Sequence, residues 1–310
     1  MFFYVCVLLA FNPLLGFALT VEDVITQGFK EHAKGHYNQA INYYNQAIHM
    51  NPHQGEAYYK RGIAKHDVGD DLGAIHDYSK AIKLNPHNAK AYYNRGHVKG
   101  DLGDKAGAIL DYNQAIQEDP NYALAYNSRG LAKADLGDDL GAIDDYSKAL
   151  ELNPNNALIY NSRGLAKADL GDKAGAMDDY SKAIELNPHY AKAYHNRGHV
   201  KANLGDKAGA MEDYSQAIYH YSNALKANPN YTDTYNSRGL AKADSGDKAG
   251  AIDDYNQVIQ RNPNDAKAFM NRGDTKLALG DRAGANHDYN KAIQLNPNYR
   301  KLCERVCRGF

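Results

Sequence analysis

One string of residues returns along almost the whole chain at a spacing of 34 residues. It reads Tyr-x-x-Arg-Gly, about a dozen further residues, Ala-x-x-x-Tyr-x-x-Ala, and a closing proline; one copy has Arg95-Gly96, Tyr112 and Pro120. A period near 34 with small and aromatic residues at fixed offsets indicates a repeat of two helices. Because such repeats stack along one dimension, the 310 residues predict one solenoid rather than two globular domains.

The closing prolines divide the chain into eight units. Seven of them follow the common length, and the sixth is seven residues longer. The units run 21–54, 55–88, 89–122, 123–156, 157–190, 191–231, 232–265 and 266–299.

Helical spacing within one unit explains the repeated positions. Tyr92 and Gly96 fall on one face of a first helix, and Ala108, Tyr112 and Ala115 do the same for a second helix. The Leu-Gly-Asp stretch between them supplies a glycine that can end the first helix and an aspartate that can cap the second. The proline at the end of each unit disfavours helix in the residue before it and so ends the second helix.

The repeated positions resemble the tetratricopeptide repeat (TPR) family over residues 21–299. The small residue of the first helix is glycine in all eight units, and the second helix keeps its alanine and its tyrosine throughout. The glycines are Gly28, Gly62, Gly96, Gly130, Gly164, Gly198, Gly239 and Gly273. The resemblance implies an all-α fold, a right-handed superhelical solenoid of antiparallel helix pairs, whose first helices line a concave groove that binds peptides.

Repeats 2–8 depart from the family pattern in their charged residues. Arginine precedes the glycine, lysine stands three residues after it, and aspartate directly precedes the tyrosine of the second helix. Repeat 1 has Gln27 and Tyr43 in place of the arginine and the aspartate. Since both charges vanish together, we predict a partly buried ion pair between the helices of each unit, bidentate where the geometry allows; the alternative is two independent solvated charges. Central pairs are Arg95–Asp111, Arg129–Asp145 and Arg163–Asp179.

The resemblance also implies which side chains would face a ligand. They vary between units and mix asparagine amides, which pair with a peptide backbone as donor and acceptor, with leucines and rows of aspartate. The candidates are Tyr93, His97, Asn127, Leu131, Asn161, Leu165, His195, His199, Asn236 and Leu240. We therefore expect a scaffold that binds an extended or helical segment of a partner protein. The charged clamp of chaperone-binding TPR domains does not appear in order.

Other classes of function receive little support from the sequence. A net charge of −1 with interspersed signs gives no footprint for nucleic acid, and motifs for phosphate loops, zinc cysteines and serine nucleophiles are lacking. His195 and His199, like His32 and His36, have the spacing of a metal pair, but neither pair has a third ligand nearby in the sequence. We predict no enzyme activity, no cofactor and no metal. Self-assembly into a structural solenoid and a metal-dependent site in the groove remain alternatives.

The two ends of the chain carry separate expectations. Residues 1–18 are an apolar run whose end fits signal-peptidase cleavage after Ala18, although a positive n-region is missing. We predict a cleaved signal peptide and a secreted or periplasmic protein; the alternative is a membrane anchor formed by residues 1–18. We expect residues 300–310 to form a capping helix or tail over repeat 8. The redox state of Cys303 and Cys307 stays open.

Repeat 6 is irregular because its second helix carries the Tyr-x-x-Ala element twice. Tyr214 to Ala217 is followed by Tyr221 to Ala224 one heptad later. Seven residues make close to two helical turns, so the apolar face is preserved. We expect this helix to run from about Ala208 to Ala227, and the solenoid to bend or open a gap there. The duplication either has no role or creates a hinge or a projecting contact surface.

Overall fold

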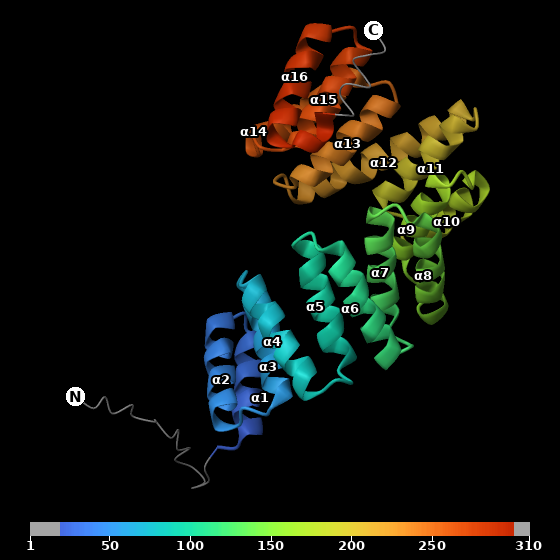
Figure 1. The fold of residues 1–310 in the computed structure, drawn as a ribbon. Coiled ribbons are helices and arrows are strands. Elements are labelled where there is room, and N and C mark those ends of the chain that lie inside the picture. The colour runs from blue at the N-terminus through green and yellow to red at the C-terminus, as the bar shows by residue number, and fades with distance from the viewer. Residues whose placement is uncertain (1–18, 301–310) are drawn as a thin grey trace. The chain divides into compact units, whose positions relative to one another are not determined.

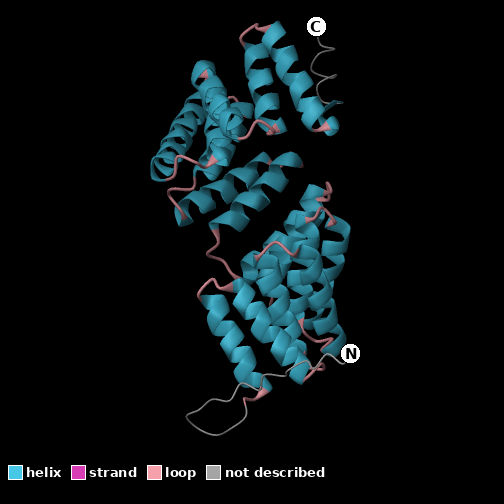
Figure 2. Ribbon diagram, turned by 90° about the vertical axis from the view of Figure 1, so that its left-hand side faces the viewer, coloured by secondary structure: helices cyan, strands magenta, loops and turns pink. Residues whose placement is uncertain are grey.

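The computed structural model describes residues 19–300. This part of the chain contains sixteen α-helices, one short 3₁₀ helix and no strand (Figures 1 and 2), which confirms the all-α prediction. The predicted signal peptide, the tail residues 301–310 and Cys303 and Cys307 lie outside the described residues. Within residues 19–300, no helix combines the length and the apolar character needed to cross a membrane.

The chain divides into two compact units, Met1–Pro154 and Asn155–Phe310. Each contains four helix pairs. The helices of the first unit are α1 (Val21–Ala33), α2 (Tyr37–Met50), α3 (Gly55–Asp67), α4 (Asp71–Leu84), α5 (Ala89–Asp101), α6 (Lys105–Glu118), α7 (Ala123–Asp135) and α8 (Asp139–Leu152). Those of the second are α9 (Ala157–Asp169), α10 (Lys173–Leu186), α11 (Ala191–Asn203), α12 (Lys207–Ala227), α13 (Thr232–Asp244), α14 (Lys248–Arg261), α15 (Ala266–Ala278) and α16 (Arg282–Leu295), followed by the 3₁₀ helix η1 (Pro297–Tyr299).

The turn between the two helices of a repeat follows the predicted chemistry. In repeat 3, α5 ends at Asp101 and Gly103 adopts a φ of 90°, the left-handed conformation that glycine reaches without strain. The Asp104 side chain then accepts a hydrogen bond from the Gly107 amide and caps α6. At the start of the array, Thr20 and Asp23 form a capping box before α1.

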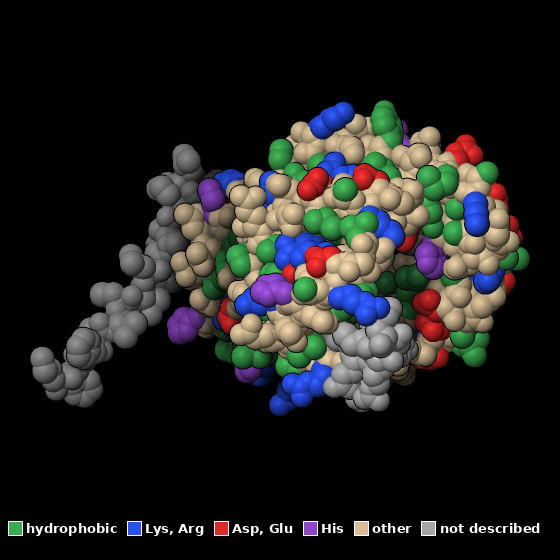
Figure 3. Space-filling model, turned by 90° about the horizontal axis from the view of Figure 1, so that it is seen from above, with side chains coloured by type: hydrophobic (Ala, Val, Ile, Leu, Met, Phe, Trp, Pro, Cys, Tyr) green, Lys and Arg blue, Asp and Glu red, His purple; other side chains and the backbone are tan. Residues whose placement is uncertain are grey.

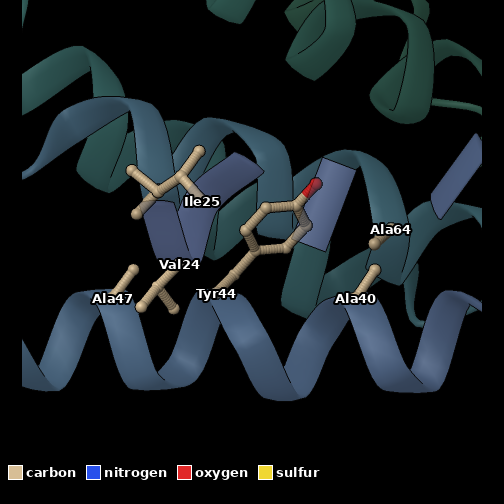
Figure 4. Close-up of a cluster of buried hydrophobic side chains, with 7 residues drawn as sticks. Val24, Ile25, Ala40, Tyr44, Ala47 and Ala64 are labelled. Atoms are coloured by element: carbon tan, nitrogen blue, oxygen red, sulfur yellow. The ribbon is translucent and has the colours of Figure 1, made fainter. Parts of the chain in front are cut away.

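The core consists of tyrosines and alanines packed between paired helices. In repeat 1, Tyr44 is 1% exposed and lies against Val24, Ile25 and Ala40 (Figure 4). Burial raises the pKa of Tyr44 to about 12, so the phenol stays neutral and serves packing. The glycine of the first helix makes room for this ring, since a Cβ built on Gly28 would lie 2.6 Å from Cε1 of Tyr44. Glycine at this position therefore permits close packing of the two helices.

The second helix of repeat 6 is longer than the others. Helix α12 has 21 residues, whereas the second helices of the other repeats have 14, in agreement with the length expected from the heptad duplication. The expected gap is wrong, because Ala217 and Tyr221 of α12 share a core with Ala241 of α13. The boundary between the two compact units lies at Pro154 instead. Seven residues preserve the apolar face of the helix, and packing therefore continues into repeat 7.

Deleting Ile218–Ala224 is expected to give a folded protein whose urea midpoint is close to that of the wild type. The shortened helix would read Asp213-Tyr-Ser-Gln-Ala217 followed directly by Leu225 and Asn228-Pro229, which is the pattern of the regular repeats. Far-UV circular dichroism during urea unfolding measures this. A broad or strongly shifted transition would show that the extra turns are needed for packing.

Candidate binding face of the first helices

First helices of consecutive repeats contact one another within each unit. In the first unit α1 contacts α3, α3 contacts α5 and α5 contacts α7, and the second unit repeats the arrangement from α9 to α15. Among the described residues, second helices of consecutive repeats make no comparable contacts. Elements that approach each other most closely line the inner side of a curved stack. The first helices therefore form the inner face of each unit.

The bidentate pairs predicted from the sequence are present in repeats 2–8. In repeat 3, Nε of Arg95 donates to Oδ2 of Asp111 at 2.9 Å and Nη2 donates to Oδ1 at 2.6 Å. The carboxylate is 5% exposed and the arginine side chain 19% exposed. Two parallel charge-assisted hydrogen bonds fix both position and orientation of the two helices. The other pairs are Arg61–Asp77, Arg129–Asp145, Arg163–Asp179, Arg197–Asp213, Arg238–Asp254 and Arg272–Asp288.

Each aspartate has a second cationic partner, which the sequence analysis did not assign. The lysine one turn after the arginine places Nζ 2.7–3.0 Å from Oδ2 of the same aspartate. In repeat 1, Glu31 occupies the position of this lysine. Each of repeats 2–8 therefore contains a charged cluster of one arginine, one lysine and one aspartate. The seven charged clusters are Arg61/Lys65/Asp77, Arg95/Lys99/Asp111, Arg129/Lys133/Asp145, Arg163/Lys167/Asp179, Arg197/Lys201/Asp213, Arg238/Lys242/Asp254 and Arg272/Lys276/Asp288.

The same arginine also reaches the preceding repeat. Nη1 of Arg95 donates to Oγ of Ser79 at 3.0 Å, and Nη1 of Arg61 donates to Oδ1 of Asn45 at 2.6 Å. In repeat 7 the acceptor is Ser222, which belongs to the second copy of the duplicated element in α12. The duplication therefore separates two roles: Asp213 binds the arginine of its own repeat, and Ser222 binds that of the next.

Protonation at the charged cluster follows from its hydrogen bonds. Burial alone would raise the pKa of Asp288, but hydrogen bonds from Arg272 and Lys276 outweigh it and lower that pKa below its ordinary value. The hydrogen bond to Asp213 raises the pKa of Arg197. Each arginine of a cluster also lies over the aromatic ring of its own helix, with Cζ 5.4–5.7 Å from the ring centroid.

The residue after the packing glycine is exposed in six of the eight repeats, whereas Ile63 and Leu240 are half-buried. Leu131 is 41% exposed in the first unit and Leu165 is 48% exposed in the second, while the neighbouring Ala132 and Ala166 are buried. Phe29 in repeat 1 is 53% exposed at the same position. On the face shown in Figure 3, acidic and basic side chains are interspersed with apolar ones. Phe29, Leu131 and Leu165 are therefore exposed apolar contact points on first helices.

Sequence models of one repeat family match most of the chain. TPR repeat models match residues 28–69, 68–103, 134–171 and 164–205, and tetratricopeptide repeat models match 89–122, 202–266 and 266–299. The chain belongs to the tetratricopeptide repeat family. No curated protein sequence matches this TPR chain.

Solved TPR structures resemble the chain over different lengths. A crystal structure of MamA is 31% identical and covers 53% of this chain and 96% of its own, with a TM-score of 0.50. A tetratricopeptide repeat protein from Parabacteroides merdae is 21% identical, with coverage of 82% and 97% and a TM-score of 0.64. Yeast Tom70 is 19% identical, with coverage of 92% and 63% and a TM-score of 0.59. The last two similarities concern the fold alone.

Two asparagines proposed for the TPR groove are buried. Asn161 is 7% exposed and Asn236 is 5% exposed. Nδ2 of Asn196 in the next repeat donates to Oδ1 of Asn161 at 3.0 Å, and Nδ2 of Asn236 donates to Asp265 at 3.4 Å. The amide of Asn161 thus serves a contact between repeats and that of Asn236 a contact with the N-cap residue of α15, and the expectation that they are open to a ligand is wrong. Oδ1 of Asn236 and Oδ1 of Asn127 are buried without a hydrogen-bond partner.

Some of the remaining groove candidates are covered by contacts within the protein, and others are exposed to solvent. Tyr93 is half-buried and its hydroxyl lies 3.4 Å from Oγ of Ser128, whereas His97 and His199 are exposed and Leu240 is half-buried. His195 is largely covered, and its Nε2 lies 2.8 Å from Oδ2 of Asp244. His97, Leu131, Leu165 and His199 are therefore the candidates with free surface.

The histidine pairs singled out from the sequence do not act as pairs. His32 contacts Asp67 at 2.6 Å and His36 contacts Glu31 at 2.8 Å, while His195 contacts Asp244. The rings of His32, His36 and His195 are oriented toward carboxylates, and Nδ1 of His199 lies 3.2 Å from Nδ2 of Asn203. Spacing on one helix could not show this, because two of the three carboxylates come from the following repeat.

Proposed function

We propose that the inner face of the first helices binds an extended or helical segment of a partner protein. The proposal rests on one observation: the position after the packing glycine carries exposed apolar side chains, Leu131 in one unit and Leu165 in the other, between buried neighbours. Membership in the TPR family supports a role in protein interaction in general. Exposed apolar side chains on first helices favour binding of a protein segment.

The charged clusters support this role by holding the face rigid. Their arginines link both helices of a repeat and the preceding repeat, which supports a fixed position of each first helix within its own unit. A surface that does not rearrange loses less conformational entropy on binding. The partner segment would carry apolar side chains for the leucines and polar groups for the intervening histidines and aspartates.

Changing Leu131 to glutamate is expected to weaken the affinity for a groove-binding peptide by about 10-fold or more, because a buried charge would replace an apolar contact. The probe is a peptide selected on the full chain from a displayed random library, and fluorescence anisotropy gives the Kd. Leu136→Glu is the matched control, since Leu136 is 58% exposed at the end of the same first helix but lies in the turn.

The two variants separate the possible binding surfaces. Loss of affinity in Leu131→Glu with little change in Leu136→Glu supports the inner face. The reverse pattern would move the site to the turns between helices. Equal affinities in both variants would place the peptide elsewhere and contradict the proposal.

A further inference from the structure

A group of metal-ligating side chains lies between repeats 2 and 3. His66 on α3 and His97 on α5 have ring centroids 6.0 Å apart. One ring nitrogen of each and one carboxylate oxygen of Asp101 all lie within 4.8 Å of one another. Nδ1 of His97 and Oδ2 of Asp101 are already 3.0 Å apart. Among the described residues, this is the group of histidine and carboxylate side chains that offers three ligand atoms to one ion.

The orientation of His66 is fixed by a further carboxylate. Nδ1 of His66 lies 2.7 Å from Oδ1 of Asp71, the first residue of α4. A carboxylate on one ring nitrogen sets the tautomer and makes the other nitrogen a better metal ligand. The nitrogen left to bind an ion is therefore Nε2. The carboxylate of Asp67, the next residue in the chain, contacts His32 instead.

The surroundings leave room for an ion and for a further ligand. His66 and His97 line a cavity of about 290 Å³ whose wall includes Ile63, Tyr78 and Val98. The side chains of His97 and Asp101 are 47% and 55% exposed, so they can rotate to close the distance to His66. Tyr93 and Asn94 also line this cavity; Ile63 and Val98 limit the access of water on one side, and the exposed ligands leave access on the other.

We propose that His66, His97 and Asp101 bind one divalent transition-metal ion of the zinc class. Two imidazoles and one carboxylate are a ligand set that zinc accepts, with the fourth position left for water or for a side chain of a bound molecule. The ion joins a first helix of repeat 2 to a first helix of repeat 3. This inference stands apart from peptide binding, because it concerns the metal alone.

The test is a calorimetric titration of the full chain with Zn²⁺ after alkylation of its cysteines. We expect one saturable site per chain. Loss of a partner that orients a ligand costs about 10–100-fold in metal affinity, so Asp71→Asn should weaken Zn²⁺ binding within that range. His97→Ala or His66→Ala removes a ligand itself and should weaken Zn²⁺ binding by more than that. His199→Ala is the matched control, since it occupies the equivalent exposed position of repeat 6, and it should leave the affinity unchanged.

Circular dichroism of each variant should show that the array remains folded, because the substituted side chains are exposed or half-buried. Absence of a saturable site in the wild type would overturn the proposal. Equal affinity in His97→Ala, or loss of affinity in His199→Ala, would overturn it as well, because the ion would then bind elsewhere.

Discussion

Replacing Asp111 by alanine is expected to lower the free energy of unfolding by about 3–5 kcal/mol. The change leaves Arg95 and Lys99, both about four-fifths buried, without the carboxylate that they share. An uncompensated buried charge costs far more than a lost surface contact, and here two charges lose one partner. Urea unfolding of the full chain, followed by far-UV circular dichroism, measures the change.

Two further variants separate this explanation from a general effect of charge removal. Glu151→Gln removes the exposed pair of Lys148 and Glu151, and it should change stability by no more than about 1 kcal/mol. The triple variant Arg95→Leu, Lys99→Met, Asp111→Leu replaces the whole cluster with apolar side chains and should unfold closer to the wild type than Asp111→Ala does. An effect of Asp111→Ala within about 0.5 kcal/mol would show that the cluster behaves like an ordinary surface pair.

Replacing Gly130 by alanine is expected to destabilise the protein, although alanine is the better helix former by about 1 kcal/mol. A Cβ at Gly130 would lie 2.8 Å from Cε1 of Tyr146, whose ring is 1% exposed and cannot move aside. Overpacking of this kind typically costs about 1–3 kcal/mol, which exceeds the gain in helix propensity. Thermal unfolding should therefore shift to lower temperature.

Gly100 provides the matched control in the preceding repeat. A Cβ there would meet Ala108 Cβ at 3.6 Å, an ordinary van der Waals distance. Gly100→Ala should therefore raise stability by about 0.5–1 kcal/mol. We therefore expect Gly130→Ala to lower the stability of the protein and Gly100→Ala to raise it. Stabilisation by both would mean that the tyrosine ring adapts and that the glycine is not needed for packing.

The helix pairs and the ion pairs could be predicted from the sequence because each is copied along the chain. The glycine at the position of Gly103 recurs in all eight repeats and the aspartate at the position of Asp104 recurs in repeats 2–8, and the left-handed φ and the capping hydrogen bond depend on adjacent residues only. The arginine and aspartate of each cluster were recognisable because both are missing from repeat 1. The lysine was visible as a departure from the family, but a long flexible side chain gives no sign of which carboxylate it reaches.

What the sequence could not show depends on how one repeat packs on the next. Asn161 is buried because Asn196 of the following repeat reaches its side chain, a contact set by the separation of α9 and α11. His66 and His97 occupy different positions of their repeats, so no spacing within one helix brings them together. The same dependence explains why the extra turns of α12 left no gap, since Tyr221 fills the added length.

Hydrogen exchange of the full chain, with and without the selected peptide, tests the central claim that the inner face of the first helices binds a protein segment. We expect bound peptide to slow exchange in first helices, such as α5 and α7 or α9 and α11, because their amides lie nearest to the ligand. The second helices α6, α8 and α10 should exchange as in the free protein. Protection concentrated in the second helices, with α5, α7, α9 and α11 unchanged, would contradict the account.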